Sequence, residues 1–343
     1  MKNRYRIPVA LMGIMMIFLC SSCANKHDME REASSAALSK KETSTKEPEN
    51  EERKIRVGFI SKSTADPFFQ EMNQYAEETL DGLQADGRIT SWTGILDGEN
   101  NPDVQNRLAG KCIEERCDYV FIVPSEPEAA DPAVTRMAEA GIKVIVLNAK
   151  TASTDEAAWV YCGSSEKEAG KLVGQFVLDH CPGAGRYLHV SSVLGSTAHI
   201  DFSQGVMQIL EAQTELEPVS EEITMMSQTE EDQVVSIVQA ALETYGEELR
   251  AVICDTDSIS AAAQKACIEA GSPEVLCIGV GGSTEAIDMV RQGNMKATAA
   301  PDGAGQVKKG IESMLEDIGN SDSATGRNGC REFDVEYLLV TGD

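Results

Sequence analysis

The stretch IRVGFISKSTADPFF, residues 55–69, shows the unit from which the chain is built. Ile55 to Ile60 form a short run rich in β-branched and aromatic side chains, which favours a strand. A polar loop follows, and Asp66 and Pro67 then supply an N-cap acceptor and a proline at the first helical position. The stretch therefore predicts a strand that leads through a polar loop into a helix.

This unit recurs along the chain as short apolar runs that alternate with amphipathic segments. The runs predict strands at 89–95, 119–123, 143–147, 158–162, 186–190, 251–254, 275–280, 296–299 and 335–340. The segments between them predict helices at 66–81, 102–116, 126–140, 165–180, 197–212, 230–245, 258–270, 284–292 and 305–318. Such alternation predicts an α/β protein with two doubly wound, Rossmann-like parallel sheets, whose ligands bind beyond the carboxyl ends of the strands.

Length and charge limit the classes of function. The chain has 343 residues and a formal net charge of −26, with 42% hydrophobic residues. One hydrophobic core rarely serves so long a chain, so two lobes are expected. The acidic balance argues against nucleic acid and against a surface that rests on anionic lipid, because both need clustered Lys and Arg.

The first 53 residues differ from the rest. Basic residues precede an apolar run over 7–19, too short to span a bilayer, and Leu19-Cys20-Ser21-Ser22-Cys23 follows. This pattern predicts a lipoprotein signal peptide at 1–22, lipidation of Cys23 and a disordered tether over 23–53. We expect an extracytoplasmic protein anchored to the cell membrane by its lipid. A plain secretory signal or an uncleaved anchor is the alternative.

Several strand ends carry motifs of one known family. They are Asp66-Pro67-Phe68-Phe69, Leu96–Pro102, Ile122-Val123-Pro124-Ser125, Gly195-Ser196-Thr197-Ala198, Asp255-Thr256-Asp257 and Ile278–Gly282. In order and spacing the chain resembles the bacterial periplasmic sugar-binding proteins, type I, of the ribose-binding kind. The resemblance implies two lobes joined by a three-strand hinge, with 54–162 plus 301–331 in the N-terminal lobe and 163–299 plus 332–343 in the C-terminal lobe. It also implies a ligand held between the lobes and no cofactor.

The resemblance and the strand ends together give a candidate ligand-binding set. Its members are Asp66, Phe68, Phe69, Ser125, Asn148, His199, Asp201, Phe202, Asp255, Thr256, Asp257 and Gly281. Aromatic rings pack on sugar C–H faces, and carboxylates and amides accept hydrogen bonds from hydroxyls. The alternative interpretation gives Asp66 and Asp257 to helix capping, a phenyl ring to the core and Asp201 to solvent.

Departures from the family bear on the ligand. Asn148-Ala149 stands where the family has Asp-Arg, Phe202 where it has Arg, and Gly281 where it has Asp. Arginine gives a bidentate geometry that Ala and Phe cannot replace, which argues against a simple ribose-like or galactose-like ligand. The acidic and aromatic set that remains leads us to hypothesise a sugar derivative that also carries an amine.

Little in the sequence supports chemistry on the ligand. The body has no C-x-x-C spacing, nucleophile elbow or Walker loop, so we expect no catalytic residue, no metal and no cofactor. Export permits disulfides, but the pairing stays open among Cys112, Cys117, Cys162, Cys181, Cys254, Cys267, Cys277 and Cys330.

The sequence thus predicts a monomeric solute-binding lipoprotein that captures a sugar-like molecule and passes it to an ABC permease. A sensor that presents its ligand to a membrane receptor kinase is the alternative. An enzyme is a third interpretation, which turnover of a candidate ligand would reveal.

Overall fold

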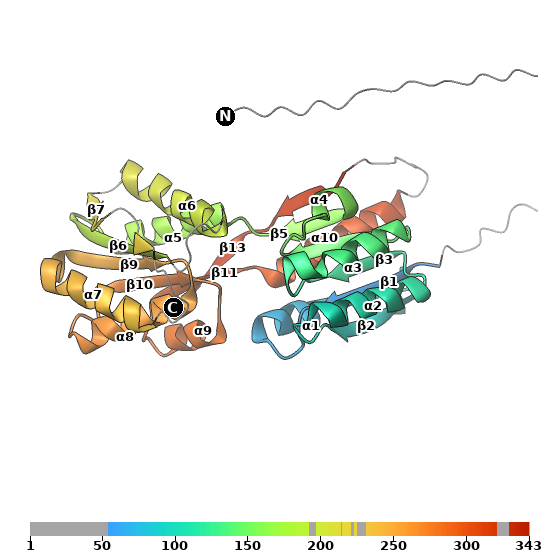
Figure 1. The fold of residues 1–343 in the computed structure, drawn as a ribbon, viewed down its shortest axis with the longest axis horizontal. Coiled ribbons are helices and arrows are strands. Elements are labelled where there is room, and N and C mark those ends of the chain that lie inside the picture. Colours follow the sequence, from blue (N-terminus) through green and yellow to red (C-terminus); the bar gives the residue numbers. More distant parts are fainter. Residues whose placement is uncertain are drawn as a thin grey trace, which may run out of the picture. The chain divides into compact units, whose positions relative to one another are not determined.

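A computed structural model describes residues 54–191, 197–213, 215–220, 223–224, 231–320 and 329–342. The predicted signal peptide (1–22), the tether (23–53) and the lipidated Cys23 lie outside the described residues. So do Gly195 and Ser196 of the predicted second-lobe loop. The described residues form one compact unit that contains two separate sheets (Figure 1).

The first lobe is built on a six-stranded sheet of order β12-β5-β4-β3-β1-β2, in which every pair of neighbours is parallel. Its strands are β1 Arg56–Ser61, β2 Ser91–Asp97, β3 Tyr119–Ile122, β4 Lys143–Asn148, β5 Val160–Gly163 and β12 Arg331–Asp334. Its helices are α1 Pro67–Ala85, α2 Pro102–Glu114, α3 Pro127–Glu139, α4 Thr154–Ala157 and α10 Gly303–Gly319.

Alternate residues of these strands enter two different cores, because side chains along a strand point to opposite faces. Phe59 and Phe121 pack with α1 and α10 on one face. Ile60 and Ile122 pack with α2 and α3 on the other. The sheet is therefore covered on both faces, as its nearly continuous apolar strands predicted.

The second lobe is built on a seven-stranded sheet of order β13-β11-β10-β9-β6-β7, with β8 paired to β6. Its strands are β6 Gly185–Ser191, β7 Leu216–Pro218, β8 Ile223–Thr224, β9 Leu249–Cys254, β10 Leu276–Val280, β11 Ala297–Pro301 and β13 Tyr337–Thr341. Its helices are α5 Glu166–His180, α6 Thr197–Gln213, α7 Glu231–Tyr245, a short 3-10 turn η1 Gly246–Glu248, α8 Asp257–Glu269 and α9 Thr284–Arg291. β13 runs antiparallel to β11. The predicted α/β fold with two doubly wound lobes is confirmed.

The chain passes between the lobes after β5, after β11 and after β12. These passages bond to one another: the Val335 amide donates to the Gly163 carbonyl at 2.7 Å, and the Asp302 amide donates to the Glu336 carbonyl at 3.2 Å. The predicted last strand at 335–340 corresponds to β13, whereas β12, which precedes it and pairs in the first sheet, was not predicted as a strand. Residues 332–334, assigned above to the C-terminal lobe, therefore pair in the first sheet.

Side chains at the strand ends start the helices. The Asp66 carboxylate accepts from the Phe68 amide at 3.0 Å at the start of α1, and Asp302 accepts from the Gly305 amide at 2.7 Å near the start of α10. In the second lobe, α5 and α6 approach closely at Gly170, where a Cβ would lie 2.0 Å from the Phe202 carbonyl oxygen. Only glycine fits there.

Candidate functional site

The expected ligand residues lie at the carboxyl edges of the two sheets. Asp66, Phe68 and Phe69 follow β1, Ser125 follows β3, and Asn148 ends β4. In the second lobe, the first turns of α6 carry His199, Asp201 and Phe202, while Asp255, Thr256 and Asp257 follow β9 and Gly281 follows β10. Parallel strands bring their carboxyl ends to one edge, so each lobe gathers its own group.

The two phenyl rings of the first loop have different environments. Phe69 is buried in the core below α1, whereas Phe68 is half-buried and meets it edge-on, with ring centroids 5.0 Å apart. Phe68 also lies beside Gly303 at the start of α10, where a Cβ would sit 3.3 Å from its Cζ. Phe68 is thus the ring of this pair that a ligand can contact, and Asp66 beside it is exposed.

Gln105 of α2 is a residue that the sequence argument missed. It is fully buried, and its Nε2 donates to the carbonyls of Ser61 at 3.2 Å and Val123 at 2.7 Å. Its Oε1 accepts from the Ser125 amide at 2.9 Å. One side chain therefore joins the ends of β1 and β3. A glutamine on the buried face of α2 was the available signal.

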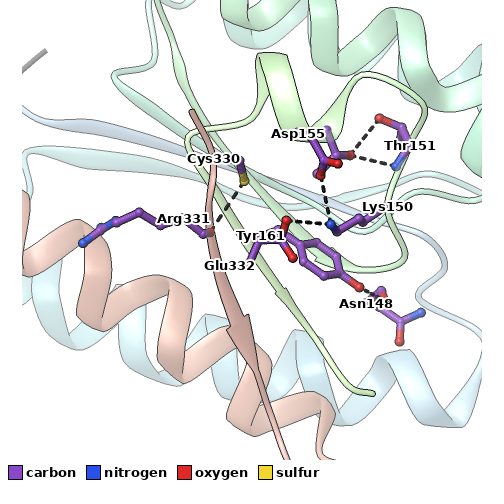
Figure 2. A network of polar contacts seen from close by, with 9 residues as sticks. Asn148, Lys150, Thr151, Asp155, Tyr161, Cys330, Arg331 and Glu332 are labelled. Atoms are coloured by element: carbon purple, nitrogen blue, oxygen red, sulfur yellow. Dashed lines mark hydrogen bonds and ion pairs between the residues drawn. The ribbon is translucent and has the colours of Figure 1, made fainter. Parts of the chain in front are cut away.

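Ser125 and Asn148 are held by their backbones. The Ser125 hydroxyl is buried, and among the described residues it has no hydrogen-bond partner. Asn148 has a φ of 68°, a left-handed conformation that asparagine tolerates better than most residues. The Tyr161 hydroxyl donates to the Asn148 carbonyl at 3.0 Å and so holds this turn in place (Figure 2).

A polar network supports the turn after β4 (Figure 2). The Lys150 ammonium lies 2.9 Å from Asp155 and 2.7 Å from Glu332 of β12, and 5.1 Å from the Tyr161 ring centroid. Burial alone would lower the pKa of Lys150, but its bonds with Glu332 and Asp155 raise it to about 12. Burial also raises the pKa of Tyr161 to about 12. The network thus connects the turn at Asn148 to the edge strand of its sheet.

In the second lobe His199 and Asp255 form a pair. Nδ1 of His199 lies 2.9 Å from Oδ2 of Asp255, and both side chains are only 7% exposed. The Ser191 hydroxyl at the end of β6 lies 2.7 Å from each ring nitrogen and can pair with only one of them. This contact fixes the first turn of α6 to the ends of β6 and β9.

Asp257 is engaged inside the protein. It is 5% exposed, and its carboxylate accepts from the Ser283 amide and from the Thr298 hydroxyl, each at 2.5 Å. Burial raises the pKa of Asp257, although the hydrogen bonds from Thr298 and Ser283 oppose this. The side chain joins the segments after β9 and β10 to the first residues of β11, and it does not cap its own helix, as the alternative interpretation had held.

A hollow of about 340 Å³ opens at this edge of the second sheet. It brings together three predicted residues, Thr256, Asp257 and Gly281, with Ser258 and Ser283. Gly281 has a φ of 140°, and a Cβ there would lie 3.3 Å from the Asp257 carboxylate. Polar groups from the starts of α8 and α9 thus share one cavity.

Asp201 and Phe202, two further predicted residues of α6, have different environments. Asp201 is exposed, as the alternative interpretation held. Phe202 is 1% exposed and belongs to the core of the second lobe, with its ring 6.0 Å from that of His189. In this structure the Phe202 ring therefore faces the core, and its contact with a ligand stays a prediction. It stands where the family has arginine, and its apolar character suits the core.

Glu166, at the start of α5, is a second residue that the sequence argument missed. Burial raises the pKa of Glu166, and the nearby carboxylates of Asp255 and Asp201 raise it further. The Tyr337 hydroxyl, which donates a hydrogen bond to the Glu166 carboxylate at 2.9 Å, acts in the opposite direction and lowers this pKa. Two neighbouring acids thus act on Glu166 at this edge. Nothing in the sequence around Glu166 distinguished it from an ordinary first-turn acid.

The described residues hold neither a cluster of metal-ligating side chains nor a helix that could cross a membrane. No group of three or more His, Cys, Asp or Glu side chains in that part of the chain could hold a metal ion. No helix there is both long and apolar enough to cross a membrane.

Comparisons with known proteins agree with this architecture. Residues 57–320 match the model of a family described as periplasmic binding protein domain. A xylitol-binding protein of Mycolicibacterium smegmatis is 20% identical over 70% of this chain and 68% of its own length. A ribose import binding protein of Escherichia coli is 21% identical over 76% of this chain and 83% of its own.

Solved structures show the same fold. A myo-inositol-binding protein from Caulobacter, bound to myo-inositol, has a TM-score of 0.57 at 22% identity, and the match covers 84% of this chain and 93% of that one. An arabinose-binding protein from Geobacillus stearothermophilus has a TM-score of 0.69 at 14% identity, with 84% and 97% covered.

Proposed function

This chain belongs to the periplasmic binding protein domain family, in its sugar-binding branch, and from that premise we propose that it captures a small polyhydroxylated molecule between its two lobes. The observation that supports this most directly is the grouping of ligand-type side chains at the carboxyl edge of each sheet. In the first lobe this group includes Phe68 and Asn148, and in the second lobe it includes Thr256, which lines the hollow of about 340 Å³. The family is extracytoplasmic.

We propose further that the ligand carries an amine. Glu166, Asp201 and Asp255 share one edge of the second lobe, and their mutual repulsion is one cause of the raised pKa of Glu166. A bound ammonium would offset this repulsion. The two arginines that the family places near a sugar are replaced by Ala149 and by the buried Phe202.

Thermal unfolding with a ligand panel tests the ligand class. The panel holds neutral polyols and pentoses (xylitol, myo-inositol, ribose), amino sugars (glucosamine, galactosamine) and an anionic sugar (glucuronate). We expect amino sugars to raise Tm most, because a ligand that binds only the folded state stabilises it. A larger shift with glucuronate would contradict the amine, and a shift with neutral polyols alone would keep the capture role but remove the amine.

Phe68 provides the test of the site itself. Mass spectrometry first identifies the ligand that co-purifies with the protein, and the affinity of that ligand is then measured for Phe68→Ala. We expect a loss of about tenfold, which corresponds to about 1.4 kcal/mol, because the variant removes the apolar ring surface on which a sugar can pack. Trp92→Ala is the matched control: this partly buried aromatic packs on the same core from the amino end of β2. Equal affinities in the two variants would reject the assignment of Phe68.

We propose that an ABC permease receives the ligand, as is usual for the family, and that Cys23 holds the protein at the membrane. Replacement Cys23→Ser should release the chain into the soluble fraction, whereas Cys20→Ser should leave it bound. Release by both or by neither would contradict the lipid assignment. Recovery of the ligand with unchanged mass after long incubation would support binding without catalysis, and a monomer by light scattering would support the proposed oligomeric state.

A further inference from the structure

Cys267 and Cys277 face each other in the interior of the second lobe. Cys267 lies in α8 and Cys277 in β10, the helix and strand that pack together in Figure 1. Their sulfur atoms are 3.9 Å apart, which is contact distance, and both side chains are fully buried in one apolar cluster. A disulfide requires about 2 Å between the sulfurs, so the two sulfurs must approach by about a further 2 Å for the pair to close.

The two thiols differ in acidity. The hydrogen bond from Cys277 lowers the pKa of Cys267, although burial opposes this. Burial, with the proximity of Cys267, raises the pKa of Cys277. Once the two side chains meet in the lobe, Cys267 is therefore the more readily ionised thiol, and the thiolate is the nucleophile in disulfide exchange.

We propose that Cys267 and Cys277 form a disulfide that joins α8 to β10. These two elements frame the second-lobe hollow: Asp257 and Ala261 of α8 line it, and so does Val280 at the end of β10. A covalent bond here would fix the distance between the helix and the strand that shape that cavity. The inference does not depend on the ligand proposed above.

The reaction needs a disulfide-bonded oxidant, for which oxidised glutathione serves as the probe. The Cys267 thiolate attacks one sulfur of oxidised glutathione and releases one glutathione thiolate. The Cys277 thiolate then attacks the Cys267 sulfur of the mixed disulfide and releases the second glutathione. Two protein thiols and one oxidised glutathione thus give one protein disulfide and two reduced glutathiones. Because both thiols are covered in the fold, the bond should form while the chain folds.

The sequence offers a clean assay. Lys265 and Arg291 bound a tryptic peptide, residues 266–291, that contains Cys267 and Cys277 and no other cysteine. The full chain is unfolded, reduced and refolded in a mixture of reduced and oxidised glutathione. Free thiols are then alkylated in denaturant, and the digest is analysed by mass. We expect this peptide to appear unalkylated and lighter by about 2 Da than its reduced form, through the loss of two hydrogens.

The controls lie in neighbouring peptides. The peptide of residues 172–186 contains only Cys181 and should take up one alkyl group. The peptide of residues 251–265 contains only Cys254, the third buried thiol near the pair, and should also be alkylated. A cross-link between that peptide and 266–291 would overturn the pairing. So would two alkyl groups or two glutathione adducts on peptide 266–291.

A stability measurement makes the result independent of digestion. Refolding with oxidised glutathione should raise the Tm of the wild type by several degrees over the reduced protein, because a cross-link restricts the unfolded chain. The variants Cys267→Ala and Cys277→Ala should each lose that oxidant-dependent shift, even if their reduced forms are less stable. A shift that persists in both variants would refute the proposal.

Discussion

Replacement of Gln105 is the sharpest test of how the first-lobe edge is held. The side chain makes three hydrogen bonds to backbone groups, at 3.2, 2.7 and 2.9 Å, and it is fully buried. Each such bond contributes about 1 kcal/mol net, and a buried partner left unpaired costs about 1–3 kcal/mol. Gln105→Ala should therefore lower the free energy of unfolding by about 3 kcal/mol or more.

Urea unfolding monitored by tryptophan fluorescence measures this loss. The chain has two tryptophans, and Trp92 and Trp159 both pack against the first-lobe core, so the signal reports the lobe that contains Gln105. The control is Gln74→Ala on α1, where an exposed side chain bonds Glu78 at 2.9 Å. That variant should change the stability by less than about 0.5 kcal/mol.

An isosteric variant separates hydrogen bonding from packing. In Gln105→Glu the shape is kept, but a carboxylate cannot donate to the Ser61 and Val123 carbonyls. It should destabilise the lobe at neutral pH at least as much as Gln105→Ala. If either Gln105 variant stays within about 1 kcal/mol of Gln74→Ala, the reasoning about this junction is refuted.

Two further predictions concern packing and pH. Gly170→Ala places a Cβ 2.0 Å from the Phe202 carbonyl oxygen and should lower the free energy of unfolding by about 1–3 kcal/mol. Gly82→Ala, in the interior of α1 with nothing within 4 Å of its Cβ, should raise the free energy of unfolding by about 0.5–1 kcal/mol. Circular dichroism in urea measures both variants, and equal effects would contradict the close contact of α5 and α6. Tyr161 holds its proton more tightly when folded, since its pKa rises from 10.0 to about 12, so its contribution to stability is complete below pH 10 and is lost as the pH rises to about 12. The pKa of Lys150, raised from 10.5 to about 12, adds a loss in the same range, so Tyr161→Phe should reduce but not abolish the alkaline decline; identical profiles for wild type and variant would show that Tyr161 does not contribute.

Local patterns sufficed to predict most of the fold. The run from Tyr119 to Val123 and the Asp66-Pro67 signal mark the position of β3 and the start of α1 as the structure has them, because burial on both faces and helix capping leave a local trace. The β12 strand had no such trace. Its side chains are alternately half-buried and exposed, and it exists because it pairs with β5, which is distant in sequence.

The candidate site was harder to predict for a related reason. Family position pointed to Phe202 and Asp257, yet Phe202 is in the core, and Asp257, which lines the hollow, also bonds Ser283 and Thr298. Position along a strand end shows which edge a side chain reaches, but the neighbours it meets there come from distant segments. Gln105 illustrates the converse, since its role depends on three backbone groups that only the tertiary fold brings together.

The placement of β12 and β13 has a consequence for biosynthesis. Residues 331–341 supply an edge strand to each sheet, β12 beside β5 and β13 beside β11. Without this segment, β5 and β11 would themselves be unpaired edge strands. A nascent chain stopped near residue 330 would expose unpaired backbone groups on β5 and β11 at once, which invites association with other chains. A chain truncated at this point should therefore aggregate more readily than the full chain.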